Sequence, residues 1–442
     1  MNTLKNIFPL LVLILVLHVS QSVFSQTIAK QYNVNELVTI AFQNNPQLKA
    51  NDKNVQASLK QIGFLDKEYQ PQVFFDVNIS RWKYLLPNKQ KLLGNSLNDI
   101  YSDVRINQLI YDWNKNSFQK EYVDESVNID RNFGRKLRQA ISFSITKNYL
   151  ELLKAKRTVQ IQEEAIAQLR EHLTNAEALY GIGKVSNLDV IKAKVQIEVA
   201  LDDLAKSKNQ LSVQKNNLNV LCGNVLSDSF DVVDTIDELW KEYSAKRFNF
   251  EELKSLLNTQ HPDLENINTQ KALRSKEIQL YKTDNYPSFY AFGITNVEDS
   301  KIPMGNFNWN VGVTVSYSLP FFKGSNFHEK IEQAEVKIGA LQETENAVAQ
   351  QLETNVKNIL LKLDDIKSRL SGNEKIIKLA EESLVTANLK YNIGKGASID
   401  VLDAETVLTT AKLNYNQIVI DLLTTIAELN YTVGSDEIAF TK

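Results

Sequence analysis

The chain has 442 residues, 43% of them apolar, so it is long enough for two or three ordinary domains with packed cores. Its formal net charge of −3 predicts no nucleic-acid partner. The only cysteine, Cys222 in "LNVLCG", excludes an internal disulfide framework and lies far from the N-terminus, where a lipid-anchored cysteine would stand. We expect Cys222 to be a small buried hydrophobe.

The first 25 residues have the pattern of an export signal. Lys5 precedes an apolar run from Ile7 to Val19, and "VFS" ends the segment with small residues at the positions that a signal peptidase reads. The run has about 13 residues, whereas crossing a bilayer takes ~20. We therefore expect cleavage after Ser25, export from the cytoplasm, and a mature chain with a net charge of −4.

The rest of the chain is predicted to consist of two copies of one structural unit. "YGIGKVSNLDVIKAK" at Tyr180–Lys194 and "YNIGKGASIDVLDAE" at Tyr391–Glu405 lie 211 positions apart, with seven of the first fourteen positions identical. "ELVTIAFQNNPQL" and "ELKSLLNTQHPDL" form a second pair, 216 positions apart. The repeats predict two units, residues 26–230 and 231–442, each with a helix, a β-hairpin and two long helices joined by a tip turn.

The middle of each unit is predicted to be a β-hairpin. In "NFNWNVGVTVSYSLP" (306–320), apolar residues from Phe307 to Leu319 alternate with Asn, Gly, Thr and Ser. This segment and "SFYAFGIT" give a hairpin at about 288–320, and "QVFFDVNISRW" and "DVRINQLIY" give one at about 72–111 around a longer insert. The long alternation suits the ~9–11 residues of a membrane-crossing strand better than the 5–6 of a globular one. The alternative, a soluble sandwich, would need more strands.

Four strands cannot close a barrel in lipid, because an open edge leaves unpaired backbone groups that cost several kcal/mol each. Several chains must therefore share one barrel. Two chains would supply 8 strands and a filled interior, whereas three would supply 12 and leave a lumen. We expect an α+β membrane protein in which each chain contributes four transmembrane β-strands.

Long helices follow each hairpin. No proline occurs between Pro87 and Pro262 or after Pro320, and the stretch from about 115 to 179 has room for a helix of ~97 Å. After each tip, apolar and small residues step by three and four over four heptads, which predicts coiled-coil hairpins. This seam consists of Val401, Ala404, Leu408, Ala411, Tyr415, Ile418, Leu422, Thr425 and Leu429, and it recurs 211 positions earlier from Val190 to Leu218.

The repeated segment predicts a tight turn at the tip of each helical hairpin, at 180–190 and 391–401. Gly183 and Gly394 would supply the positive φ that ends a helix. Asn187 and Ser398 are the predicted N-caps, each followed two positions later by an aspartate that favours the helix dipole.

Together these motifs resemble the TolC-type outer-membrane efflux factors, the outer membrane efflux protein family, over essentially the whole mature sequence. The resemblance rests on the duplicated tip turns, on "SIDVLDAETVLTTAKLNY" (Ser398–Tyr415), on the "LN…G" endings at Gly223 and Gly434, and on the two hairpins. It implies a homotrimer with a shared twelve-stranded barrel in the outer membrane and a helical tunnel across the periplasm. It also implies passive conduction in a tripartite efflux or type I secretion system, with a periplasmic adaptor (membrane fusion protein) and an inner-membrane transporter as partners.

The resemblance also implies a gate. Asp400 and Asp403 match aspartates that form acidic rings at the closed periplasmic end, and Tyr391 and Asp189 match a pair that holds the closed state. Some family members place a basic residue in that lock where this chain has Gly396. The residues expected to contact the adaptor are Gly181, Gly183, Lys184, Gly394, Lys395 and Gly396. Lys395 is the candidate to replace the missing charge, and ordinary capping and surface charge are the alternative interpretation of the four gate residues.

The sequence contains few signs of a catalytic site. No "HExxH" or "CxxC" motif occurs, and "GIGK" at Gly181 lacks the first glycine and the Ser/Thr of a phosphate loop. The histidines stand apart without metal-ligand spacing, at His18, His172, His261 and His328. We therefore predict no catalytic residue, no cofactor and no metal. A periplasmic coiled-coil scaffold without a pore remains the alternative, against which the alternating strand at 307–319 argues.

Overall fold

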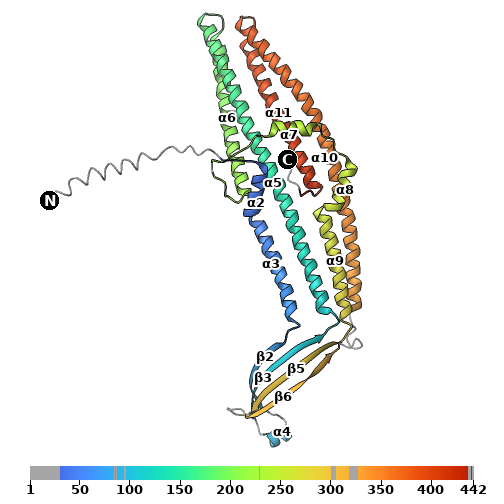
Figure 1. The fold of residues 1–442 in the computed structure, drawn as a ribbon. Coiled ribbons are helices and arrows are strands. Elements are labelled where there is room, and N and C mark those ends of the chain that lie inside the picture. Colours follow the sequence, from blue (N-terminus) through green and yellow to red (C-terminus); the bar gives the residue numbers. More distant parts are fainter. Residues whose placement is uncertain are drawn as a thin grey trace, which may run out of the picture.

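The computed structural model describes residues 30–83, 85, 87–93, 96–227, 229–299, 305–317, 327–436 and 440. The predicted signal peptide and the end of the second hairpin, at Leu319 and Pro320, lie outside these residues. The molecule is elongated, with a β-sheet at one end and the tips of two helical hairpins at the other (Figure 1).

The elements follow the same order in both parts of the chain. The first part consists of β1 (Gln31–Tyr32), α2 (Val34–Asn44), α3 (Pro46–Lys67), β2 (Gln72–Lys83), α4 (Pro87–Leu93), β3 (Ser96–Tyr111), α5 (Lys115–Gly181) and α6 (Asn187–Leu221). The second consists of β4 (Asp231–Val232), α7 (Ile236–Ala245), α8 (Phe250–Gln260), α9 (Pro262–Thr283), β5 (Ser288–Asp299), β6 (Asn306–Ser316), α10 (Phe327–Asn392) and α11 (Ser398–Thr432). Only α4 and α7 lack a counterpart among the described elements.

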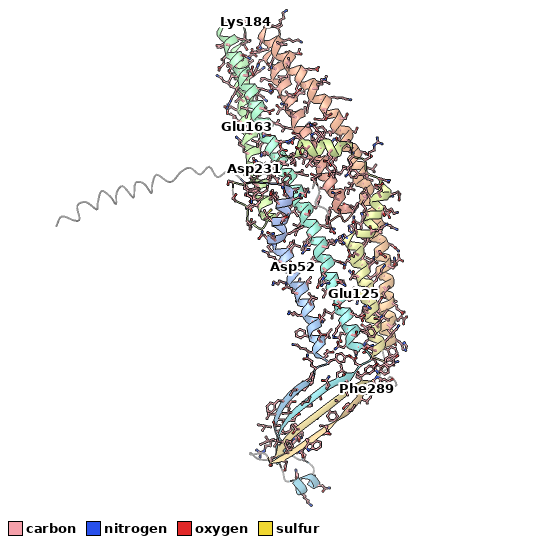
Figure 2. All side chains as sticks on the ribbon, in the orientation of Figure 1. Asp52, Glu125, Glu163, Lys184, Asp231 and Phe289 are labelled. Carbon is pink, nitrogen blue, oxygen red and sulfur yellow. The ribbon has the colours of Figure 1, made fainter. Side chains whose placement is uncertain are left out.

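Helices α5 and α10 run through most of the molecule. They have 67 and 66 residues, so each is about 100 Å long at 1.5 Å per residue. Figure 2 shows Lys184 at the tip end and Phe289 where the sheet begins. On the sheet side α5 packs against α3 and α9, and on the tip side it packs against α6 and α11. Within the described residues no helix is both long and apolar enough to cross a membrane.

The four long strands form one antiparallel sheet in the order β2-β3-β5-β6. Strands β2 and β3 pair along their length from Gln72↔Asn107 to Lys83↔Ser96, and β5 and β6 pair from Ser288↔Ser316. The central pairing joins strands that belong to different parts of the chain, β3 to β5, with a bulge near Leu109. Strand β3 begins seven residues before the expected Asp103, because its pairing with β2 continues to the insert.

The register assigns each side chain of the sheet to one of two faces, since directly opposite residues share a face. The first face is mainly apolar, and on the edge strands β2 and β6 its nonpolar side chains are 56–71% exposed. Its apolar side chains are Val73, Phe75, Val77, Ile79, Ile100, Val104, Ile106, Phe289, Ala291, Val297, Phe307, Trp309, Val311, Val313 and Val315. The same face carries Ser102, Gln108, Thr295 and Asp299 on the central strands β3 and β5, and Arg81 and Lys83 at the end of β2. The other face is mostly polar and includes Asp76, Asp103, Arg105, Asn296, Glu298, Asn306, Asn308 and Asn310.

The main core lies halfway along the helices. The short parallel pair β1–β4, helices α2, α7 and α8 and the ends of α6 and α11 surround α5 and α10 there. Every residue of the predicted α11 seam is buried except Tyr415, which is half-buried. Along α6 the equivalent seam is buried near the tip and at Leu218 but only half-buried between, because α6 has α5 as its main neighbour.

The two "LN…G" endings occupy equivalent places. Gly223 follows α6 and lies against Asn44 at the α2–α3 junction, and Gly434 follows α11 and lies against His261 at the α8–α9 junction. A Cβ would approach to 2.9 Å of Asn44 Cβ at the first position and to 2.7 Å of His261 Cα at the second. Both close contacts therefore depend on the absence of a side chain.

Candidate gate at the hairpin tips

The two tip turns have the same backbone geometry. Gly183 and Gly394 adopt φ values of +71° and +76°, the left-handed conformation that glycine adopts without strain. In each turn the glycine N–H and the N–H that follows it donate to carbonyls of the preceding helix, all at 2.9 Å. This pattern satisfies the last carbonyls of α5 and α10, so each long helix ends at its glycine turn and the chain reverses.

The predicted N-caps are wrong by one residue. Ser186 and Ala397 are the N-cap residues, and Asn187 and Ser398 are the first residues of α6 and α11. Because Ala397 has no side chain that can accept a hydrogen bond, the second helix lacks the side-chain cap that was expected. Ser398 is instead 1% exposed and faces the other hairpin, as described below.

The first-turn aspartates each bind the start of their own helix. Asp189 Oδ2 accepts from Ser186 N at 3.2 Å and from Ser186 Oγ at 3.1 Å. Asp400 Oδ2 accepts from Ala397 N at 3.1 Å. Both carboxylates thus satisfy an N–H that the helix leaves free and interact favourably with the helix dipole. Asp400 and Asp403 lie one turn apart on α11, and both are exposed in the single chain.

Tyr391 connects the two hairpins, although not through a hydrogen bond to Asp189. It is 1% exposed, and its ring packs on the ring of His172 in α5, with centroids 4.9 Å apart. Burial raises the pKa of Tyr391, and the nearby Asp189 charge adds to this, while the Ser398 hydroxyl lowers it. The Tyr391 hydroxyl makes no hydrogen bond of normal geometry within the described residues.

His172 is a member of this cluster that the sequence did not identify. Its Nε2 lies 2.8 Å from Ser398 Oγ, and its side chain is 3% exposed. Burial lowers the pKa of His172, and the negative charge of Asp189 opposes this shift in part. A lone histidine 226 positions from its partner carries no signal in a single sequence.

The position of the missing basic residue is crowded. A Cβ at Gly396 would lie 3.0 Å from Lys390 Cβ and 3.1 Å from Tyr391 N, so a side chain there would fit only if these neighbours shifted by a few tenths of an ångström. Lys395 is exposed at the tip, beside Gly394. Gly181 and Lys184 are likewise exposed in the first turn, so the residues expected to contact an adaptor lie together at the free end of the molecule.

Comparison with known proteins agrees with this architecture. A model of the family described as "Outer membrane efflux protein" matches residues 37–224 and 253–435. The chain belongs to the outer membrane efflux protein family. It is 21% identical to the outer membrane protein TolC of Vibrio cholerae serotype O1 over 441 residues, covering 98% of this chain and 96% of that protein.

Solved structures of this family have the same fold. A crystal structure of CusC matches with a TM-score of 0.73 and 17% identity, covering 92% of this chain and 93% of that one. The open state of the MtrE outer membrane channel of Neisseria gonorrhoeae matches with a TM-score of 0.71 and 15% identity, covering 92% and 91%. The relatives of this outer membrane efflux protein are outer-membrane channel proteins rather than enzymes.

A second titratable group is buried in the same α5–α11 interface. Glu405, one turn beyond Val401 on α11, is 4% exposed, and burial raises its pKa to about 7. Lys412 lowers this pKa and Glu171 raises it further. With its amide nitrogen turned toward α11, Gln168 donates to Glu405 Oε2 at 2.8 Å. Gln168 and His172, one turn apart on α5, thus form successive polar contacts with α11 of the second hairpin.

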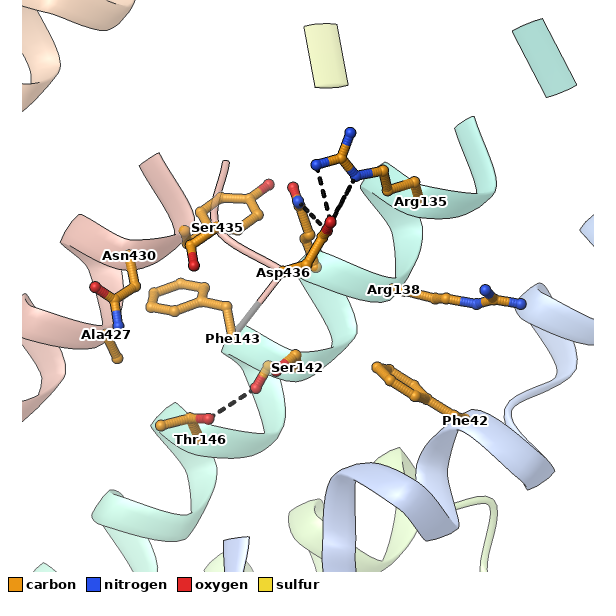
Figure 3. Close-up of a pocket in the computed structure, with 12 residues that line it drawn as sticks. Phe42, Arg135, Arg138, Ser142, Phe143, Thr146, Ala427, Asn430, Ser435 and Asp436 are labelled. Atoms are coloured by element: carbon orange, nitrogen blue, oxygen red, sulfur yellow. Dashed lines mark hydrogen bonds and ion pairs between the residues drawn. The ribbon is translucent and has the colours of Figure 1, made fainter. Parts of the chain in front are cut away.

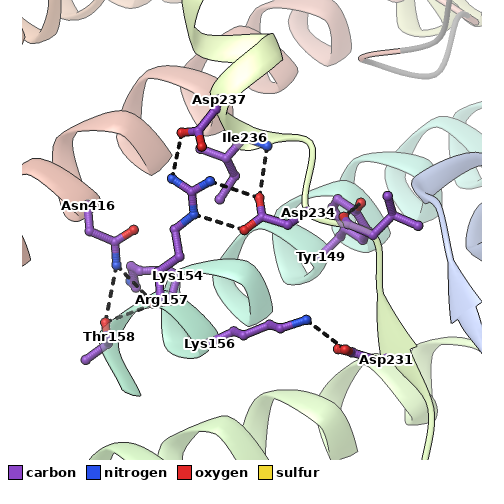
Figure 4. A network of polar contacts seen from close by, with 11 residues as sticks. Tyr149, Lys154, Lys156, Arg157, Thr158, Asp231, Asp234, Ile236, Asp237 and Asn416 are labelled. Atoms are coloured by element: carbon purple, nitrogen blue, oxygen red, sulfur yellow. Dashed lines mark hydrogen bonds and ion pairs between the residues drawn. The ribbon is translucent and has the colours of Figure 1, made fainter. Parts of the chain in front are cut away.

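Two further polar clusters lie near the middle of the helices. Figure 3 shows a pocket of about 420 Å³ between α2, α5 and α11, in which Arg135 Nε donates to both oxygens of Asp436 at 3.0 Å. In Figure 4, Arg157 of α5 binds Asp234 with two nitrogens and Asp237 with a third. These ion pairs attach two parts of the chain to α5: the segment that follows α11 and the start of α7 with the residues just before it. Within the described residues, no group of three or more His, Cys, Asp or Glu could hold a metal ion.

Proposed function

We propose that the chain forms the outer-membrane channel-tunnel of a tripartite efflux or type I secretion system and conducts substrates passively from the periplasmic side to the exterior. One observation carries the proposal: a four-stranded sheet with one mainly apolar face stands at one end of helices about 100 Å long, and carboxylates are exposed at the other end. The channel needs no catalytic residue or cofactor.

The sheet is proposed to be the third of a membrane barrel that each chain contributes. Its strands of 11 to 16 residues are long enough to cross the apolar part of a bilayer. The apolar face would contact outer-membrane lipid and the polar face would line the lumen. Aromatic rings gather at the junction with the helices, where Trp113 stacks on Tyr286 with centroids 4.8 Å apart and contacts Tyr111, as expected of an interfacial belt.

Three chains would close the barrel. The edge strands of the described sheet are β2 and β6, and pairing β6 of one chain with β2 of the next removes every edge and gives twelve strands. A homotrimer is also supported by the outer helices near the tips, which carry exposed apolar side chains that a neighbouring chain could cover. These are Leu188, Ile191, Val195 and Val199 on α6, Ile376, Leu379 and Leu389 on α10, and Ile393 in the turn that follows α10.

The gate is proposed to lie at the tips. Three copies of Asp400 and Asp403 would place six carboxylates around the threefold axis, which repels anions and attracts cations. The contact of Tyr391 with the first hairpin, near Asp189, would hold these helices in place. Six tip turns, two from each chain, are suited to docking a periplasmic adaptor joined to an inner-membrane transporter, through Gly181, Gly183, Lys184, Gly394, Lys395 and Gly396.

The domain organisation follows from the same proposal. Residues 1–25 are a cleavable signal peptide that directs the chain to the cell envelope, and 26–230 and 231–442 are two copies of one unit. Each copy supplies one β-hairpin to the barrel and one helical hairpin to the tunnel. The helices would then stand in the periplasm.

Single-channel conductance in planar bilayers tests this function. Wild-type protein should form small cation-selective pores that divalent cations block from the tip side, and Asp400→Ala/Asp403→Ala should lose the block because the carboxylate ring is gone. Asp364→Ala/Asp365→Ala, which removes two exposed charges from α10 far from the tips, is the matched control and should keep it. Folded, membrane-bound oligomers that form no pores would refute the channel and favour the periplasmic scaffold.

A further inference from the structure

Three polar side chains from three helices are buried together where the two hairpins meet. His172 of α5, Tyr391 of α10 and Ser398 of α11 are 3%, 1% and 1% exposed. Buried polar atoms almost always have hydrogen-bond partners, yet His172 Nδ1 and Tyr391 Oη have none within the described residues. The cluster therefore holds more hydrogen-bonding capacity than it uses.

His172 is the link between the hairpins in this cluster. Its Nε2 is 2.8 Å from Ser398 Oγ, and its ring contacts Tyr391 at 4.9 Å between centroids. One side chain of the first hairpin thus touches both helices of the second. The cluster lies beside the small apolar core of the tips, which includes Ala176, Val190, Val401 and the ring of Tyr391 itself.

Each of the three helices that pack against His172 presents one polar or charged side chain to it. On α6, Asp189 is the charged group that acts on the pKa of His172, and it already accepts two hydrogen bonds from Ser186. On α10 the facing group is Tyr391, and on α11 it is Ser398. Farther along the α5–α11 interface, Glu405 is buried beside Gln168, and its pKa is raised by burial.

The crowded turn explains why a histidine could take this role. A side chain at Gly396 would be tightly crowded by Lys390 and the backbone of Tyr391, and Lys395 is exposed. A proton on His172 is therefore the positive charge that the cluster can gain without rebuilding the turn.

We propose that His172 is a positioning residue of the gate, holding the second hairpin against the first while it is neutral and releasing it when it is protonated. The inference rests on the channel function proposed above. An imidazolium ion needs either water or a close counter-ion, and the buried site supplies neither in full, since Asp189 is engaged with Ser186. Protonation therefore favours an arrangement in which the hairpins separate and water reaches the ring.

The sign of the pH dependence follows from burial. The pKa of His172 in the packed arrangement lies below its ordinary value of about 6.5, so the proton binds more readily when the hairpins are apart. Packing is strongest above that pH and weakens as the pH falls, by at most about tenfold per pH unit for each linked proton. Glu405 has the opposite dependence, because its pKa is raised and packing weakens as the pH rises.

Because Glu405 has the opposite pH dependence, the test is carried out in proteins that carry Glu405→Gln. Single-channel conductance is measured between pH 7.5 and 5.0 for Glu405→Gln, for Glu405→Gln/His172→Gln, and for Glu405→Gln/His261→Asn. Glutamine at position 172 keeps a polar partner for Ser398 and cannot be protonated. His261 is the matched control, because it is also buried, with a pKa lowered by burial, but caps α9 far from the tips.

Conductance of Glu405→Gln and of the His261 control should rise severalfold as the pH falls, whereas the His172→Gln protein should show no rise. An acid response that survives His172→Gln, or pores whose conductance ignores pH in all three proteins, would overturn the role of His172 while leaving the channel intact. Absence of pores from folded trimers would instead refute the channel function.

Hydrogen exchange provides a readout that needs neither pores nor the His172 variant. In Glu405→Gln, residues 398–408 should exchange faster at pH 5.5 than at pH 7.5 after correction for the intrinsic rate, and residues 416–429 should not. If the corrected exchange rates of residues 398–408 are the same at pH 5.5 and pH 7.5, the proposal is overturned, even if His172→Gln fails to assemble.

Discussion

Glu405→Gln should stabilise the packing of α11 against α5 at alkaline pH. The carboxyl group is 4% exposed, and burial raises its pKa to about 7 from the ordinary 4.5. Because the pKa is raised in the packed state, the neutral acid stabilises that state. This contribution is complete below pH 4.5 and is lost as the pH rises through 7. A glutamine has the same shape, can pair with Gln168, and stays neutral at every pH.

The shift sets the magnitude of the effect. A packed-state pKa of about 7 against 4.5 corresponds to about 3 kcal/mol at pH 8. The Gln168 amide donates to the ionised carboxylate and stabilises it further, so we expect roughly half of this, about 1–2 kcal/mol. At pH 5 the packed carboxyl is still protonated, whereas a carboxyl with a pKa of 4.5 is about three-quarters ionised, so the shift alone leaves about 0.8 kcal/mol and the expected difference falls below about 0.5 kcal/mol.

Hydrogen exchange of residues 402–411, compared between variant and wild type at one pH, measures this difference without correction for intrinsic rates. Protection should rise about 5- to 30-fold at pH 8 and change little at pH 5. Glu382→Gln, a substitution of an exposed glutamate on α10, should change neither value. Equal protection of wild type and Glu405→Gln at pH 8 would refute the reasoning, as would a gain that is the same at both pH values.

Three further predictions concern stability and reactivity. Gly434→Ala should lower the melting temperature, because φ is +74° there and a Cβ would lie 2.7 Å from a backbone atom of the α8–α9 junction; Gly339→Ala, in open space on α10, should be neutral or slightly stabilising. Leu422→Ala removes a fully buried side chain from the α11 seam and should cost about 2–5 kcal/mol in chemical denaturation. Cys222 should resist maleimide at pH 7.5 until the protein unfolds, because it is buried and its pKa is raised to about 11; rapid labelling of the native protein would contradict its burial.

Periodicity made the secondary structure readable from the sequence. The helices α5 and α10, their glycine turns and the alternating strands all follow from local patterns, because 3.6-residue and two-residue periods and positive-φ glycines act within a few positions. The N-caps were misplaced by one residue for a related reason. Serine and asparagine near a helix start satisfy the same rule at neighbouring positions, and the contact of Ser398 with His172 decides its place in the tertiary structure.

The partners of the gate residues could not be read in this way. His172 meets a hydroxyl 226 positions away, and Glu405 meets Gln168 at 237 positions. In a single sequence His172 and Glu405 are isolated polar residues in helices where most polar residues are exposed. Their burial depends on how α5 crosses α11, which in turn depends on side chains along the whole seam.

The sequence by itself determined that this chain is built from long helical hairpins and long amphipathic strands, and it located their turns, because each of these features is encoded within a few neighbouring residues. The tertiary structure alone decided that β3 pairs with β5, which joins both hairpins in one sheet with one apolar face. It also decided that His172, Tyr391 and Ser398 meet where the hairpins touch. Such contacts are long-range, and their geometry is fixed only when the helices and strands pack together.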